Sequence, residues 1–243
     1  MVWSKLENPT AFDLAPRIDI KPIIDALIRF FTTWDERLTS LAKKLTKAFQ
    51  LENDYSLLSK PENLGVLEGE EARKYMTRLT AKFWETLVRL LEEIMPEIDQ
   101  FLLFTKNEAQ NIYLQLKRVL AELERTSRPF RTENEEDYNN ATNEFILFAQ
   151  NLLDEVIYDS GIKQSVMNEL SGQFLHDENK KNLETLRAYM LCLQNHSLGA
   201  DIKTILEVLQ FGQQLMNYRP LSVLDGKGSY HSKFLQLSSR IAF

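Results

Sequence analysis

The sequence predicts an all-α protein, an elongated bundle of about six to seven helices built from long antiparallel hairpins. Glycine and proline number only 8 and 7 among 243 residues, whereas a fold of many short strands needs such residues at its frequent turns. Apolar residues recur at every third or fourth position in each long segment, which is the period of an α-helix. Strict alternation of apolar and polar residues, which is typical of strands, is nearly absent.

Three parts of the chain are expected. Residues 1–21 form an N-terminal arm with two prolines, residues 22–217 form a single helical bundle domain, and residues 218–243 form a basic C-terminal tail. Within the domain, two long hairpins precede a set of shorter helices, and we predict these three units at 22–95, 106–158 and 162–217.

The first predicted helix spans residues 22–50 and begins with Pro22, a residue that suits the first turn of a helix. Its apolar residues follow one another at alternating steps of three and four, which is a heptad repeat. Such a stripe can pair within one chain or between two copies, so a homo-oligomer formed through this helix is one expectation. The stripe consists of Ile24, Leu27, Phe31, Trp34, Leu38, Leu41, Leu45 and Ala48.

Two local patterns divide the next segment, which follows a connection over residues 51–69. We predict that the second helix ends or kinks at Pro96, because proline lacks the N–H that a helix interior requires. The pattern Thr105-x-x-Glu108 is typical of a capping box and predicts that a third helix begins there.

A second capping box, Thr132-x-x-Glu135, predicts the start of a fourth helix, and Gly161 is expected to end it. Shorter helices follow. The last of them, over residues 200–217, is apolar around most of its circumference, so we predict that it lies at the centre of the bundle.

Charge and composition argue against several classes of protein. The net charge is −6, which disfavours binding to nucleic acid. The longest stretch without Asp, Glu, Lys or Arg covers residues 188–200, which is shorter than the roughly 20 residues of a transmembrane helix, so no membrane span is expected. The single cysteine, Cys192, cannot form an intrachain disulfide, and a cytoplasmic location is therefore expected.

The sequence lacks the familiar motifs for catalysis and metal binding, and it contains only three histidines. None of the three follows a glutamate at the Glu-x-x-His spacing that di-iron bundle enzymes use, and no Gly-x-Ser-x-Gly nucleophile motif occurs. Cys192 and His196 share a helix face, but a zinc site needs at least three protein ligands. We therefore predict no catalytic residue, no cofactor and no metal site.

An arginine-rich turn is the first candidate binding site. Arg125, Arg128 and Arg131 surround Phe130 between the predicted third and fourth helices. Arginine beside an aromatic residue is typical of anion sites and of interaction hot spots. The alternative is a solvated loop whose charge is neutralised by neighbouring acidic residues.

The C-terminal tail is basic. It contains one acidic residue, Asp225, and four basic residues, namely Arg219, Lys227, Lys233 and Arg240. The charge of the tail is therefore +3, which leaves −9 on the rest of the chain. One terminal helix is expected over residues 230–241. A basic tail can fold back onto the acidic body of the chain or bind an anionic partner. We expect the first, because the apolar residues of the tail would otherwise be exposed.

Three functional hypotheses follow from the sequence. The first is a non-enzymatic cytosolic adaptor or assembly subunit that binds an unidentified protein through its helix faces. The second is a small-molecule binding protein whose apolar cavity is lined by aromatic residues. The third is an enzyme whose site brings together Arg187, His176 and His196. The residues expected to line the cavity of the second are Phe145, Phe148, Tyr189 and Phe211.

Overall fold

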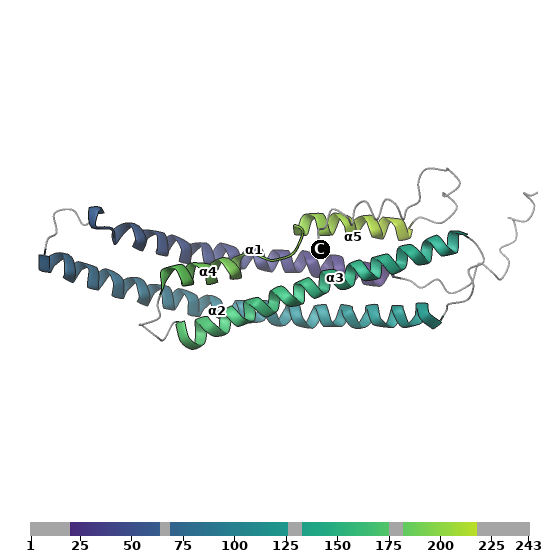
Figure 1. Ribbon diagram of the computed structural model, residues 1–243, viewed down its shortest axis with the longest axis horizontal. Helices are drawn as coiled ribbons and strands as arrows, with labels where there is room; N and C mark the ends of the chain where they lie inside the picture. Colours follow the sequence, from purple (N-terminus) through teal and green to yellow (C-terminus); the bar gives the residue numbers. More distant parts are fainter. Residues whose placement is uncertain (1–19, 64–68, 126–132, 175–181, 218–243) are drawn as a thin grey trace, which may run out of the picture.

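The computed structural model describes residues 20–63, 69–125, 133–174 and 182–217 (Figure 1). These residues form five α-helices, and no strand occurs among them, which confirms the all-α prediction. A 3-10 turn, Pro61–Asn63, follows α1, and a π-helical turn, Leu170–Phe174, continues α3. The helices are α1 (Lys21–Leu58), α2 (Gly69–Arg125), α3 (Glu133–Glu169), α4 (Leu183–Gln194) and α5 (Ile202–Asn217).

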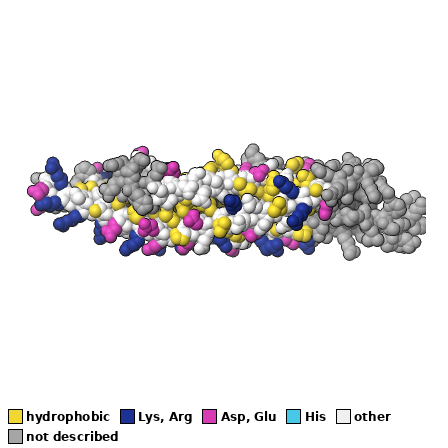
Figure 2. Space-filling model, turned by 90° about the horizontal axis from the view of Figure 1, so that it is seen from below, with side chains coloured by type: hydrophobic (Ala, Val, Ile, Leu, Met, Phe, Trp, Pro, Cys, Tyr) yellow, Lys and Arg dark blue, Asp and Glu magenta, His cyan; other side chains and the backbone are white. Residues whose placement is uncertain are grey.

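The bundle is elongated, as two perpendicular views show (Figures 1 and 2). α1 contacts α2, α4 and α5, while α3 packs on α2 and α4. The predicted central position of the last helix is therefore wrong. α5 lies against α1 at the side of the bundle, with Lys203 and Gln210 exposed to solvent. None of the described helices combines the length and apolar character needed to cross a bilayer.

α1 and α2 run antiparallel along most of their shared length (Figure 1). Near one end, Tyr55 Oη lies 3.1 Å from Thr80 Oγ1, and further along, the Phe30 and Phe104 rings stack with their centroids 5.9 Å apart. All eight residues of the predicted heptad stripe, from Ile24 to Ala48, are buried within the chain. The stripe is thus covered by this chain's own helices, so it does not offer the surface for a homo-oligomer that the sequence suggested.

α2 is a single helix of 57 residues, about 86 Å long at the usual rise per residue. α2 does not end at Pro96 and no new helix begins at Thr105, so both of these predicted boundaries are wrong, while the alternative of a kink at Pro96 stays a prediction. Pro96 lies on the exposed side of α2, where its ring meets solvent instead of a packed neighbour. Thr105 is buried inside the helix, and its hydroxyl donates to the Phe101 carbonyl at 2.8 Å instead of capping an N-terminus. Packing of the residues on both sides of Pro96 against α1 offsets the cost of the proline.

α3 also continues where the sequence predicted an end. Gly161 is exposed within the helix, and among the described glycines only Gly69 has a positive φ, so Gly161 lacks the left-handed conformation of a helix stop. The first part of the unit predicted over 162–217 therefore belongs to α3, which continues to Glu169. Its buried residues, including Lys163 and Met167, hold this extension against the bundle.

The remaining boundaries differ from the predictions in smaller ways. α1 continues past the predicted end at residue 50 to Leu58, because no glycine or proline lies between Pro22 and Pro61. These merged helices explain why the described residues form five helices where six to seven were predicted. The N-terminal arm over 1–19 and the tail over 218–243 lie outside the described residues.

Candidate functional site

A groove of about 340 Å³ runs between α1 and α2, near the end of the bundle that contains their connection. Two half-buried leucines, Leu51 of α1 and Leu90 of α2, contribute its apolar surface. Charged side chains of both signs stand beside them, so the groove offers apolar and ionic contacts together. Its lining consists of Lys47, Gln50, Leu51, Asp54, Thr86, Arg89, Leu90 and Glu93.

Helical spacing explains why this groove forms. On each helix, the lining residues have the spacing i, i+3, i+4 and i+7, which places them along one side of the helix. The hydroxyl of the lining residue Thr86 donates to the Lys82 carbonyl at 2.8 Å and so is turned toward its own helix.

α4 packs on a different side of α1. Glu52 is buried on α1, and its carboxylate lies 3.8 Å from the guanidinium of Arg187 on α4. Because successive residues of a helix are about 100° apart, Leu51 and Glu52 face different directions. Among the described residues, only those of α1 and α2 line the groove, whereas α4 occupies the Glu52 side.

A second polar feature lies where α3 meets the connection between α4 and α5. Asp159 and Lys163 of α3 are 3% and 1% exposed and form a buried ion pair, with the ammonium 2.8 Å from Oδ2. Lys163 also donates to the backbone carbonyl of Asn195. The backbone N–H and the hydroxyl of Ser197 each donate to Asp159 Oδ1 at 2.9 Å. Through these hydrogen bonds, the ion pair holds the connection between α4 and α5 against α3.

His196 lies within this polar cluster, which we define as Asp159, Lys163, Asn195, His196 and Ser197. Its ring packs on Trp34 with centroids 5.7 Å apart, and its Nδ1 is buried without a hydrogen-bond partner among the described residues. Burial lowers the pKa of His196 below its ordinary value, and the nearby Lys163 ammonium lowers it further. The carboxylates of Asp159, Asp35 and Asp201 oppose this shift. The neutral imidazole is therefore the form that fits the folded protein.

Cys192 lies one turn before His196 at the end of α4. Burial raises the pKa of its thiol, and the Lys163 ammonium partly offsets the rise. A raised pKa disfavours the thiolate, the form that acts as a nucleophile and as a metal ligand. Among the described residues, no three His, Cys, Asp or Glu side chains are grouped as metal ligands are.

Most of the arginine-rich turn lies outside the described residues. Arg128, Phe130 and Arg131 lie outside the described residues, and of Arg125 the structure describes only that it ends α2.

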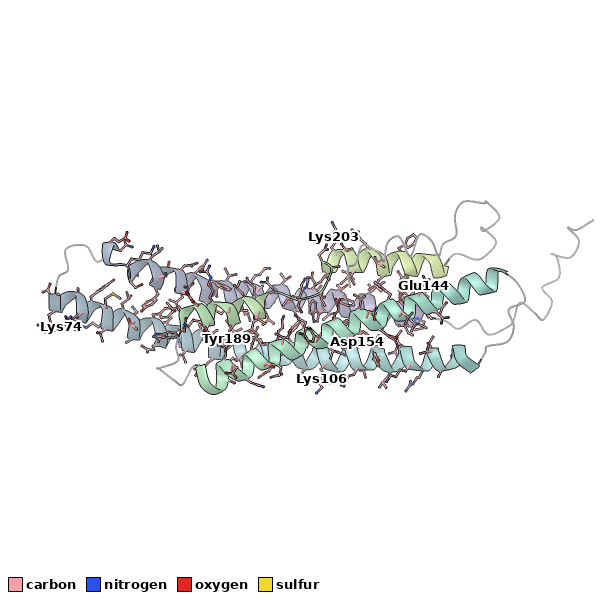
Figure 3. The ribbon with its side chains drawn as sticks, in the orientation of Figure 1. Lys74, Lys106, Glu144, Asp154, Tyr189 and Lys203 are labelled. Carbon is pink, nitrogen blue, oxygen red and sulfur yellow. The ribbon has the colours of Figure 1, made fainter. Side chains whose placement is uncertain are left out.

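The four aromatic residues proposed to line a cavity lie in different surroundings. Phe145 and Phe148 are buried in the core, with their ring centroids 6.5 Å apart. Tyr189 on α4 and Phe211 on α5 are half-buried. Figure 3 shows that Tyr189 lies far along the bundle from Glu144, the neighbour of Phe145. The structure thus brings the two phenylalanines together and places Tyr189 apart from them.

The structure describes two of the three residues of the enzyme hypothesis, Arg187 and His196, and these two contact different parts of the bundle. Arg187 approaches Glu52, whereas His196 packs on Trp34. His176 lies outside the described residues.

The groove and the polar cluster were both missed by sequence reasoning. The i,i+4 spacing of Asp159 and Lys163 is visible in the sequence, but the same spacing is common on exposed helix faces. Comparison of the chain with protein-family models, with curated proteins and with solved structures finds no match.

Proposed function

We propose that this protein is a non-enzymatic cytosolic adaptor or assembly subunit, and that it binds a helix of a partner protein in the groove between α1 and α2. The observation that supports this proposal is the open groove itself, with Leu51 and Leu90 half-buried and charged residues beside them. Recognition of an amphipathic helix commonly uses a groove of this kind, with apolar anchors and polar margins.

The chain supports the proposal with an internal parallel. α1 already packs against a short helix, α4, on the side of Glu52. On the Leu51 side, α1 and the antiparallel α2 together offer a groove to a partner helix. Lys47 and Asp54 on α1, with Arg89 and Glu93 on α2, provide charges that would fix the register and direction of the bound helix.

The proposal is tested by filling the groove without disturbing the core. Thr86→Arg places a long cationic side chain over the groove, and Thr77→Arg is the matched control. Both threonines lie on α2 and donate to the carbonyl four residues earlier, at 2.8 and 2.9 Å. They are nine residues apart, so they face nearly opposite directions around the helix. Equal helicity and melting temperature of the two variants would establish that both fold.

Partner binding is measured by affinity capture from the source cell with quantitative mass spectrometry. We expect Thr86→Arg to lose at least one protein that the unmodified chain and Thr77→Arg both retain, by about tenfold or more. If Thr86→Arg retains every protein captured by the unmodified chain, the groove is not the binding site.

A further inference from the structure

A second groove lies between α1 and α5, toward the other end of α1. It measures about 480 Å³ and is lined by Asp25, Ile28 and Arg29 of α1 and by Gln210 and Gln213 of α5. The amide of Gln213 donates to the carboxylate of Asp25 and so joins the two helices within it.

One half-buried apolar residue lies on the groove side of each helix. Ile28 on α1 packs against the core while lining the groove. On α5, Leu206 is half-buried and lies seven residues before Gln213, hence two turns away on the same side of the helix. On α1, the exposed Asp35 lies two turns after Ile28 by the same argument. The groove and the surface beside it therefore combine two partly covered aliphatic side chains, Ile28 and Leu206, with the acidic residues Asp25 and Asp35 and one cation, Arg29.

The C-terminal tail has the complementary chemistry. In the sequence, Tyr230, Phe234, Leu237 and Ile241 follow one another at steps of four, three and four, which is the spacing of one apolar helix face. Lys233 and Arg240, seven residues apart, share one flank of that face. An amphipathic segment with a basic flank suits a groove that offers aliphatic and acidic groups.

Chain connectivity favours this segment over other occupants. α5 ends at Asn217, one turn after the groove residue Gln213. Residues 218–229 contain Pro220, Gly226 and Gly228, which suit a reversal of chain direction. Twelve residues reach about 40 Å when extended, which is ample to return the chain to the start of the groove. Being tethered beside the groove also gives the tail a high effective concentration there.

We propose that residues 230–241 of the tail dock in the groove between α1 and α5, with their apolar face toward Ile28 and Leu206. The basic flank then lies near Asp25 and Asp35. This docked segment covers apolar surface on α1 and α5 and extends the bundle by one element. It uses a surface separate from the α1–α2 groove, so it stands independently of the proposed function.

Paired cysteines in the full chain test this proposal. In a Cys192→Ser background, Ser238→Cys marks the tail beside its apolar face, and Gln210→Cys marks the groove. Arg29→Cys is a second groove position, so that one poorly oriented pair does not decide the result. The matched control is Asp154→Cys, an exposed position on α3 that is labelled in Figure 3 and that the tail is long enough to reach.

Under mild oxidation, we expect an intramolecular disulfide to form about tenfold faster or more from residue 238 to a groove position than to residue 154. The charge reversals Lys233→Glu and Arg240→Glu together should slow the groove reaction several-fold. Deletion of 218–243 should raise amide hydrogen exchange in 25–32 and 202–213. Equal rates for groove and control positions, or disulfide-linked dimers in place of the intramolecular product, would overturn the proposal.

Discussion

Replacing Lys163 with alanine removes the cationic half of the buried ion pair with Asp159. The two side chains are 2% and 4% exposed, and the ammonium lies 2.8 Å from the carboxylate. At an effective dielectric constant of about 20, this distance corresponds to an attraction of about 6 kcal/mol, most of which offsets the cost of burying both charges. The variant leaves the Asp159 carboxylate buried with only Ser197 as a donor. We therefore expect a loss of about 3–5 kcal/mol in the free energy of unfolding.

The loss is measured by guanidinium denaturation followed by far-UV circular dichroism. A change of this size corresponds to a fall of roughly 10 °C in melting temperature for a chain of this length. The matched control is Lys74→Ala, because Lys74 pairs with Glu70 at 2.7 Å with the same i,i+4 relation but with side chains 67% and 80% exposed. Removing that exposed pair should change stability by less than about 0.5 kcal/mol.

A double variant separates the effect of an unpaired charge from that of lost packing. Asp159→Leu with Lys163→Met removes both charges and leaves only the hydrogen bonds to Ser197 and Asn195 unmade. It should recover at least about 1 kcal/mol relative to Lys163→Ala. A loss below about 1 kcal/mol in the single variant, or a double variant as unstable as the sum of the two single ones, would refute the reasoning.

Two further predictions concern a titrating residue and a helix interior. His196 has a pKa lowered by burial, so the unfolded chain takes up a proton more readily than the folded one, and stability should fall as the pH drops below about 6.5. His196→Phe, which retains a ring against Trp34, should show a smaller fall in melting temperature between about pH 7 and pH 5.5, and an unchanged fall would contradict the assignment. Pro96→Ala should raise the free energy of unfolding by about 1–3 kcal/mol because it restores the missing N–H in the middle of α2. If denaturation measurements instead show a lower free energy of unfolding for Pro96→Ala, α2 requires the proline at this position.

Helix periodicity predicted much of the fold correctly. The eight-residue stripe of α1 is wholly buried, as a repeat with steps of three and four implies. A different kind of evidence, local signals for helix ends, was misleading at Pro96, Thr105 and Gly161, where the helices continue. A proline or glycine inside a helix costs about 1–3 kcal/mol, and packing on either side of these residues compensates for it. Local patterns therefore predicted the all-α class correctly but wrongly divided α2 and α3 into shorter helices.

The candidate sites depended on long-range placement. The residues lining the groove between α1 and α2 have ordinary amphipathic spacing, and their importance arises from the side on which α4 packs. Likewise, Asp159 and Lys163 have the spacing of an exposed ion pair, and their burial results from the connection that carries Asn195 and Ser197. Sequence spacing contains no information about which distant segment will cover a given side of a helix.

Local chemistry was sufficient to establish that the chain is helical and which stripe of α1 faces inward, because side chains three and four positions apart share one face whatever surrounds them. Contacts between segments far apart in the chain decided three things: that α2 and α3 are continuous, which sides of α1 stay open, and which polar residues are buried. Those contacts set the local free-energy balance at each proline, glycine and charged pair. A short window of sequence contains only one of the two segments that form such a contact.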